Sequence, residues 1–217
     1  MRFVGGIANK SIVQTHVFYL NLMDDIYSTY RAVQPGETPF PFTDVPESRW
    51  SYPYIKELYD AGGVSGMTAT TFAPAENMTR AQFVTMLAGL QGADVSAYRT
   101  GKFTDVPADA WYAPYVSWAA ENGVVYGVSD TAFAPGADIS RQDMAVMVYR
   151  YAECFGIRLG TDVPPVTFTD TGDIAAYALP AVQALQRAGV ISGMPDGSFR
   201  PYGTVTREQA CTMLCML

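Results

Sequence analysis

Three short stretches, Phe42-Thr-Asp-Val-Pro46, Phe103-Thr-Asp-Val-Pro107 and Phe168-Thr-Asp170, decide the organisation of this chain. The first two begin 61 residues apart and the last two 65. Further along, Phe72-Ala-Pro74 recurs as Phe133-Ala-Pro135 and Phe199-Arg-Pro201, at offsets of 61 and 66. Because these markers keep their order and spacing, they predict three tandem repeats, over residues 40–99, 100–164 and 165–217.

Each repeat predicts two helices. The first begins beside a proline, which suits the first turn of a helix, and ends at a glycine that adopts a left-handed conformation: Pro53 and Gly62, Pro114 and Gly123, Pro180 and Gly189. The second begins at a Ser or Thr N-cap and has a polar residue three positions later, as in a capping box: Thr79 and Gln82, Ser140 and Asp143, Thr206 and Gln209. One repeat is too small to bury a sufficient core alone. We therefore expect a mainly α fold in which three two-helix repeats form a pseudo-threefold spindle.

Residues 1–39 precede the repeats and predict a further helical segment. Apolar residues recur at helical spacing up to Arg31, and a Pro- and Gly-containing linker follows. Docking on the repeats, a remnant of an upstream domain and self-association through residues 1–31 all remain open as roles. Gly5-Gly6, Asn9 and Lys10 interrupt the apolar N-terminal stretch, so no signal peptide is predicted and an exported form is expected to be a fragment or a mature product.

Composition excludes several classes of function. The 217 residues include 21 acidic and 14 basic side chains, a formal net charge of −7, which disfavours nucleic acid and anionic membrane surfaces. No apolar run approaches the ~18–20 residues of a membrane-spanning helix. His16 is the only histidine, and no Cys/His cluster has zinc spacing. We therefore expect neither an enzyme, nor a metal site, nor a cofactor.

The repeated Phe-Thr-Asp-Val-Pro, the aromatic residue before the first helix, Gly189-Val-Ile-Ser-Gly-Met-Pro-Asp-Gly-Ser-Phe-Arg-Pro201 and the Thr-Arg-x-Gln motif resemble S-layer homology domains. The resemblance covers about residues 40–217. It implies a three-pronged spindle of helices at the bacterial cell surface or cell wall. It also implies that a secondary cell-wall polysaccharide, often with a pyruvylated terminal sugar, binds in grooves between neighbouring repeats.

The family's Thr-Arg-Ala-Glu motif matches Thr79-Arg80-Ala81-Gln82, Ser140-Arg141-Gln142-Asp143 and Thr206-Arg207-Glu208-Gln209. The closing Glu is absent from all three, but Gln and Asp are also expected to bond back to the N-cap amide. The third repeat departs further, because it has Tyr177 in place of Trp and one extra residue before its first helix.

The arginine of this motif, Arg80, Arg141 or Arg207, lies where the helix dipole disfavours a cation. Two interpretations stay open. The arginine forms an ion pair with the aspartate of its own repeat, Asp44, Asp105 or Asp170, or its guanidinium binds a carboxylate on a ligand, which arginine does bidentately. The resemblance favours ligand contact.

The other candidate site residues are aromatic or small. Trp50, Trp111 and Tyr177 offer a flat face for a sugar ring, or alternatively pack into the core. Gly66, Gly127 and Gly193 are turn residues whose amides, with Ser65 and Ser192 beside them, are candidates to bond sugar hydroxyls. The sequence thus predicts a non-catalytic module that anchors a surface protein to an anionic wall glycan. The alternative is a surface-layer or other assembly protein that acts through protein–protein contacts.

Overall fold

The helices form where the repeats predict them. The computed structural model describes residues 39–98 and 101–217, and in these residues it has helices and no strand. The α-helices are α2 (Tyr52–Asp60), α3 (Arg80–Leu90), α4 (Ala113–Glu121), α5 (Arg141–Cys154), α6 (Leu179–Arg187) and α7 (Arg207–Cys215). The prediction of a mainly α protein is therefore confirmed. The helix predicted to end near Arg31 and its self-association lie outside the described residues.

Local sequence signals explain where the helices begin and end. A proline occupies the first or second position of α2, α4 and α6, where its missing N–H leaves no hydrogen bond unmade. Gly62, Gly123 and Gly189 follow these helices with φ of 74°, 75° and 76°, a left-handed conformation that glycine adopts without strain.

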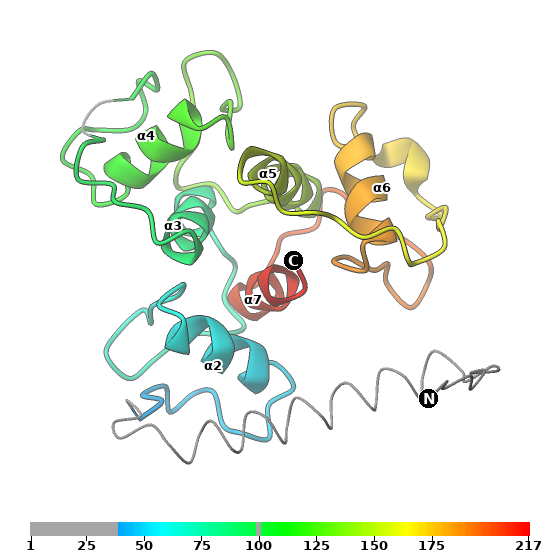
Figure 1. Cartoon of the computed structure of the whole chain (residues 1–217), viewed down its shortest axis with the longest axis horizontal. Helices are drawn as coiled ribbons and strands as arrows, with labels where there is room; N and C mark the ends of the chain where they lie inside the picture. The colour runs from blue at the N-terminus through cyan, green and yellow to red at the C-terminus, as the bar shows by residue number, and fades with distance from the viewer. Residues whose placement is uncertain (1–38, 99–100) are drawn as a thin grey trace, which may run out of the picture. The chain divides into compact units, whose positions relative to one another are not determined.

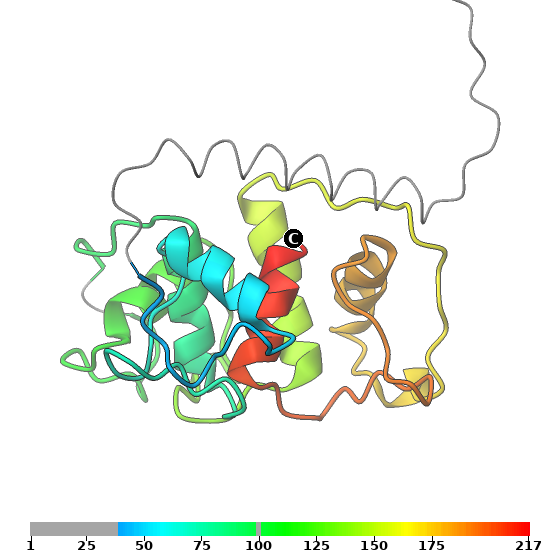
Figure 2. The same ribbon diagram turned by 90° about the horizontal axis from the view of Figure 1, so that it is seen from below.

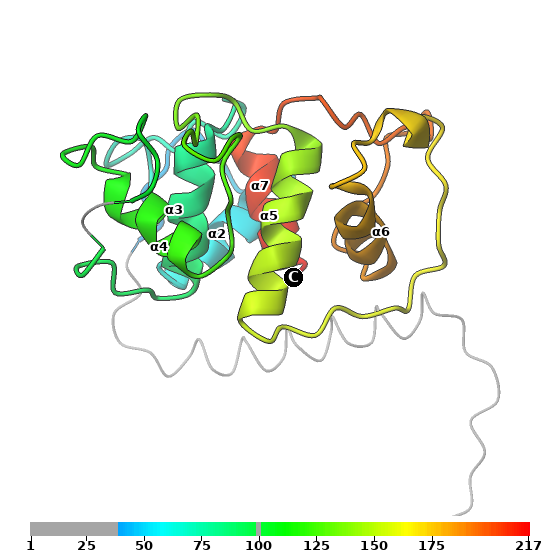
Figure 3. The same ribbon diagram turned by 90° about the horizontal axis from the view of Figure 1, so that it is seen from above.

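The helices pack between repeats rather than within them. Each first helix packs on the second helix of the preceding repeat, so that α4 contacts α3, α6 contacts α5, and α2 contacts α7. Figure 1 shows α3, α5 and α7 near the centre, with α2, α4 and α6 outside them. In Figures 2 and 3, α7 and α5 lie side by side. Because α2 packs on α7, the last helix of the chain contacts the first repeat, and residues 40–217 form one compact unit.

The segments that lead into α3, α5 and α7 join the repeats through their backbones. The amide of Met78 donates to the carbonyl of Val205 at 2.8 Å, and the amide of Ile139 donates to the carbonyl of Met78 at 2.9 Å. All three side chains are fully buried. The three N-caps are therefore fixed relative to one another, which matters because the arginines follow them directly.

The third repeat absorbs its extra residue in a turn. Asp44 precedes Trp50 by six residues, whereas Asp170 precedes Tyr177 by seven. A single 3-10 turn, η1 (Thr171–Asp173), occupies this interval. Tyr177 consequently reaches the same place before its helix as the tryptophans of the other repeats.

Candidate functional site

The aspartate of each Phe-Thr-Asp motif binds the backbone of the Phe-x-Pro segment in its own repeat. We call these segments, 72–74, 133–135 and 199–201, the corners. The two carboxylate oxygens of Asp105 accept hydrogen bonds from the amides of Phe133 and Ala134, at 2.8 and 2.7 Å. Asp44 and Asp170 make the same pair of bonds in their repeats. Burial raises the pKa of Asp105, but these amides and a nearby arginine outweigh it, so that the pKa lies below its ordinary value.

Each motif arginine crosses to the corner of the next repeat. The Nε atoms of the arginines donate to a phenylalanine carbonyl at 2.8–2.9 Å, and each guanidinium lies over that phenylalanine ring, 4.4–5.0 Å from its centroid. The pairs are Arg80 with Phe133, Arg141 with Phe199, and Arg207 with Phe72. The interpretation in which Arg80, Arg141 or Arg207 forms an ion pair with the aspartate of its own repeat is therefore wrong. The aspartate holds the corner from inside the repeat, and the arginine holds it from the preceding one.

These contacts run from the first repeat to the second, from the second to the third, and from the third back to the first. Arg80 and Arg207 are only 5% exposed, and burial lowers the pKa of both guanidinium groups. The hydrogen bonds of their Nε atoms to carbonyls compensate part of that desolvation. The arginine at a helix start thus has a structural purpose that the sequence does not reveal, which is to join the repeats.

Arg80 differs from the other two arginines in the hydrogen-bond partner of its terminal guanidinium nitrogen. Arg207 and Arg141 donate from Nη2 to the carbonyls of Ser65 and Ser192, at 2.9 and 3.3 Å. Arg80 instead donates from Nη1 to a carboxylate oxygen of Asp143 at 3.3 Å. The other oxygen of Asp143 accepts a hydrogen bond from the Tyr177 hydroxyl at 2.7 Å. Burial, together with this bond, raises the pKa of Tyr177 to about 12.

A groove opens beside this cluster. Its volume is about 350 Å³, and we call it the Arg80 groove; its lining includes Arg80, the loop 125–128, Asp143, Val146, Met147, Arg150 and Tyr177. Arg80 belongs to the first repeat, the loop and the α5 residues to the second, and Tyr177 to the third. The groove therefore exists only when all three repeats are assembled, and it has apolar, aromatic, cationic and anionic groups on its walls.

The three predicted aromatic residues lie at the surface. The exposed fractions of Trp50, Trp111 and Tyr177 are 56%, 60% and 58%. The alternative that these rings pack into the core is therefore wrong. Their exposed faces are therefore available to a ligand.

The predicted glycines are required by close packing. A Cβ on Gly66 or Gly127 would lie 2.4–2.5 Å from the ring of the Phe-Thr-Asp phenylalanine and from a nearby carbonyl, so no larger residue fits. Gly193 packs in the same way against Phe168. Gly127 lines the Arg80 groove, whereas Ser65 and Ser192 are exposed and their carbonyls bind the arginines.

Two of the three predicted capping boxes are present. Thr79 with Gln82 and Thr206 with Gln209 each form both reciprocal bonds. Ser140 accepts a bond from the Asp143 amide at 3.2 Å, but the Asp143 side chain does not close the box. That expectation was wrong because the carboxylate binds Arg80 and Tyr177 instead, as described above.

Several residues at the contacts between repeats could not be recognised from the sequence. Glu208 accepts two hydrogen bonds from Arg49, at 2.7 and 3.0 Å, and one from the Ser51 hydroxyl at 2.6 Å. Its equivalent in α5, Gln142, accepts from the Ala175 amide at 3.0 Å, and the equivalent in α3 is Ala81. The change from Ala to Gln to Glu at one repeat position is the signal that was available, but the partners belong to another repeat.

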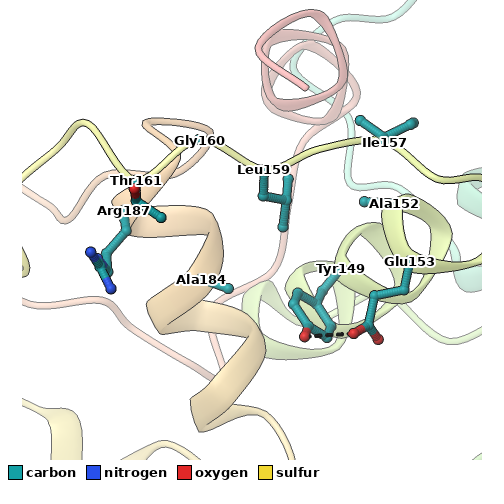
Figure 4. A pocket seen from close by; sticks show the side chains of 9 residues that line it. All are labelled: Tyr149, Ala152, Glu153, Ile157, Leu159, Gly160, Thr161, Ala184 and Arg187. Carbon is teal, nitrogen blue, oxygen red and sulfur yellow. Dashed lines mark hydrogen bonds between the residues drawn. The ribbon is translucent and has the colours of Figure 1, made fainter.

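A second cavity, of about 340 Å³, lies between α5 and α6 (Figure 4). Its lining includes Tyr149, Leu159 and Arg187, and the Tyr149 hydroxyl donates to Glu153 at 2.7 Å. None of the site residues predicted from the sequence lines this cavity. The Arg80 groove is therefore the better candidate site.

A family model for the S-layer homology domain matches residues 41–84, 102–145 and 167–211. The chain belongs to the S-layer homology family. This membership confirms the resemblance stated from the sequence, and it indicates a location at the cell surface or cell wall. In the described part of the chain, no helix is both long and apolar enough to span a membrane.

Curated relatives include proteins of the bacterial cell surface. The chain is 35% identical to an endoglucanase of Bacillus sp. (strain KSM-635), over 82% of this chain and 19% of that protein. It is 30% identical to a cellulosome-anchoring protein of Acetivibrio thermocellus, over 82% of this chain and 38% of that protein. It is 25% identical to an S-layer protein of Bacillus thuringiensis subsp. finitimus, over 80% and 21%. The chain thus spans well under half of these relatives, and the family and the relatives together support a cell-surface anchoring role.

Proposed function

We propose that this chain is a non-catalytic anchoring module that binds an anionic, pyruvylated secondary cell-wall polysaccharide in grooves between its repeats. The observation that carries the proposal is the Arg80 groove, whose walls come from all three repeats. Its volume of about 350 Å³ is within the range of small-ligand sites. The family and the anchoring relative support the same function.

The walls of the groove suit a saccharide. The exposed Tyr177 ring offers an apolar face for a sugar ring, and its hydroxyl and the Asp143 carboxylate offer hydrogen-bonding groups for sugar hydroxyls. The net charge of −7 gives an anionic polymer no long-range attraction, so the attraction must be local and short-ranged.

We further propose that the closed cycle of arginine contacts reflects the pseudo-threefold spindle of the family. In that arrangement, Trp111 and Trp50 occupy places equivalent to Tyr177 beside the other two arginines. The protein then offers the polysaccharide three related but chemically different grooves. In the part of the chain that the structure describes, residues of all three repeats line the Arg80 groove.

Sedimentation with purified cell-wall sacculi tests this function. The chain is expected to co-sediment with sacculi that retain the secondary polysaccharide and to stay in solution when that polymer has been extracted. Replacing the exposed rings by W50A, W111A and Y177A together should abolish co-sedimentation, while lowering the free energy of unfolding by no more than about 2–3 kcal/mol, the sum of three surface substitutions and the lost hydrogen bonds of the Tyr177 hydroxyl.

Two results would contradict the proposal. Equal sedimentation with intact and extracted sacculi would show that the polysaccharide is not the ligand. Oligomers that form without any glycan, together with no binding to either preparation, would favour the assembly protein instead.

A further inference from the structure

A second arginine lies in the Arg80 groove. Arg150, on the last turns of α5, lines the groove together with Tyr126. Its guanidinium carbon lies 4.2 Å from the centroid of the Tyr126 ring. Arg150 is half-buried and Tyr126 is 57% exposed, so the pair lies at the surface with the guanidinium over the ring.

The charges in the groove leave Arg150 as its uncompensated group. Arg80 is bound to the Phe133 carbonyl and to the Asp143 carboxylate, so these two charges offset each other. Asp143 is the only acidic residue that lines the groove within the described part of the chain. No ion pair of the described residues involves Arg150. The groove therefore has a net positive charge, and that charge lies on Arg150.

The pair of Arg150 and Tyr126 occurs in the second repeat and has no equivalent in the first or third. The positions equivalent to Arg150 are Gly89 and Met216, at the same offsets of 61 and 66, and those equivalent to Tyr126 are Ser65 and Ser192. Moreover, α3 and α7 contain no Lys or Arg after their first residue. The other two repeats consequently have no counterpart of this cation on their second helices.

We propose that Arg150 is the residue that recognises the acidic substituent of the saccharide, and that the Arg80 groove is therefore the groove specific for a carboxylate-bearing sugar. The inference rests on the proposed function and adds the residue and the groove that read the charge. In this reading Arg80 builds the wall of the groove, and its bond to Phe133 stays in place when ligand binds.

The physical reason is preorganisation. A guanidinium binds a carboxylate through two parallel N–H···O bonds, which give both energy and orientation. The Tyr126 ring restricts the conformations of the Arg150 side chain, so less entropy is lost when the ligand binds. Walls on several sides of the groove also reduce the screening of the charge by water and salt.

Calorimetric titration with two matched probes tests the inference. The first probe is a wall polysaccharide with ketal-linked pyruvate, and the second is the same polymer after mild acid has removed the pyruvate. The variant is R150Q, and the control is R158Q, which makes the same charge change at an exposed linker residue outside the groove. Thermal unfolding of both variants checks that they fold.

R150Q is expected to weaken binding of the pyruvylated polymer about 10- to 100-fold, the loss typical of a hydrogen bond to a charged group. It should leave binding of the depyruvylated polymer unchanged, and R158Q should alter neither. R150K, which keeps the charge but not the planar fork, should give an intermediate loss.

Other outcomes separate the two proposals. If the wild type binds the pyruvylated polymer and R150Q binds it equally well, the role of Arg150 is wrong and the anchoring function stands. If R150Q weakens binding of both polymers by the same factor, Arg150 does not recognise the carboxylate, and the inference is again wrong. If the wild type binds neither polymer, the proposed function itself fails.

Discussion

Two equivalent arginines have different surroundings. Arg207, between the third and first repeats, bonds to the carbonyls of Phe72 and Ser65, and the next residue, Glu208, binds Arg49. Arg80, between the first and second repeats, bonds to one such carbonyl and to Asp143, beside a groove of about 350 Å³. The comparison teaches that the invariant part of the repeat joins the repeats. The side chains that vary between repeats decide whether a contact is only closed or also offers a site.

Removing Arg207, between the third and first repeats, should have the largest effect on the free energy of unfolding. R207A is expected to lower the free energy of unfolding by about 3 kcal/mol, because two hydrogen bonds from a charged group and the contact with the Phe72 ring are lost. Chemical denaturation measures this loss. R80A should cost a similar amount, since its bond to Phe133 is equivalent.

An R207A protein as stable as the wild type would contradict this account of the arginine. The expected instability also affects binding experiments, because a loss of wall binding in R80A, R141A or R207A does not by itself show a ligand contact. Only variants with an unchanged unfolding midpoint are informative there.

The Glu208–Arg49 pair should contribute less, and its contribution should depend on pH. Burial raises the pKa of Glu208, but hydrogen bonds from Arg49 and Ser51 outweigh it, so the pKa in the folded protein lies below the ordinary 4.5. The pair therefore stabilises the fold above that value, and its contribution is lost as the pH falls through the lowered pKa.

We expect E208Q to reduce the free energy of unfolding by about 1–2 kcal/mol at pH 7, because the Arg49 side chain is 29% exposed and solvent screens the pair. Denaturation series from pH 7 to pH 3 should show this difference shrinking below about pH 4.5. E47Q, at an exposed glutamate before α2, is the matched control. Parallel pH profiles for E208Q and the wild type would count against the pair.

At the contact beside the Arg80 groove, removing the Tyr177 hydroxyl should lower the free energy of unfolding by about 1 kcal/mol, the usual net value of a hydrogen bond. Y177F removes the 2.7 Å bond to Asp143 and the 3.3 Å bond that the hydroxyl accepts from Gln142, and it keeps the ring. The same denaturation assay measures the loss, with Y202F at a more exposed tyrosine as the control. If Y177F costs no more than Y202F, the bond does not organise the groove.

The smallest effect is expected at the corners themselves, and it has the opposite sign. Ala134 has φ of 57°, which strains an alanine but not a glycine. A134G should therefore raise the free energy of unfolding by about 0.5–1 kcal/mol despite the more flexible unfolded chain. A137G, at an exposed alanine without a positive φ, should lower it. A lower stability for A134G would show that the corner is not strained.

The sequence predicted what depends on local interactions. The prolines and glycines around α2, the N-cap of α3 and its capping box all act within a few residues, so their patterns could be interpreted directly. The exposed position of Trp111 was left open, because an aromatic residue before a helix suits either the core or a ligand.

The contacts between repeats could not be predicted in this way. Each repeat has an arginine and an aspartate, and one of the two interpretations of the sequence paired them within one repeat. The arginine of the first repeat binds the second instead, and Asp143 leaves its capping box for the same reason. Once the neighbour of each repeat is known, the contact of Glu208 with Arg49 and the place of Arg150 beside Arg80 and Tyr177 can be understood.

A crystal structure of the chain with a pyruvylated disaccharide from the wall polymer tests the central claim most directly. We predict that the pyruvate carboxylate lies within ion-pair distance of Arg150, that a sugar ring lies on Tyr177, and that Arg80 keeps its bond to Phe133. A disaccharide held by Arg80 after that bond has broken, or bound outside all the contacts between repeats, would contradict the claim that varied side chains bind the ligand while the repeated arginines join the repeats.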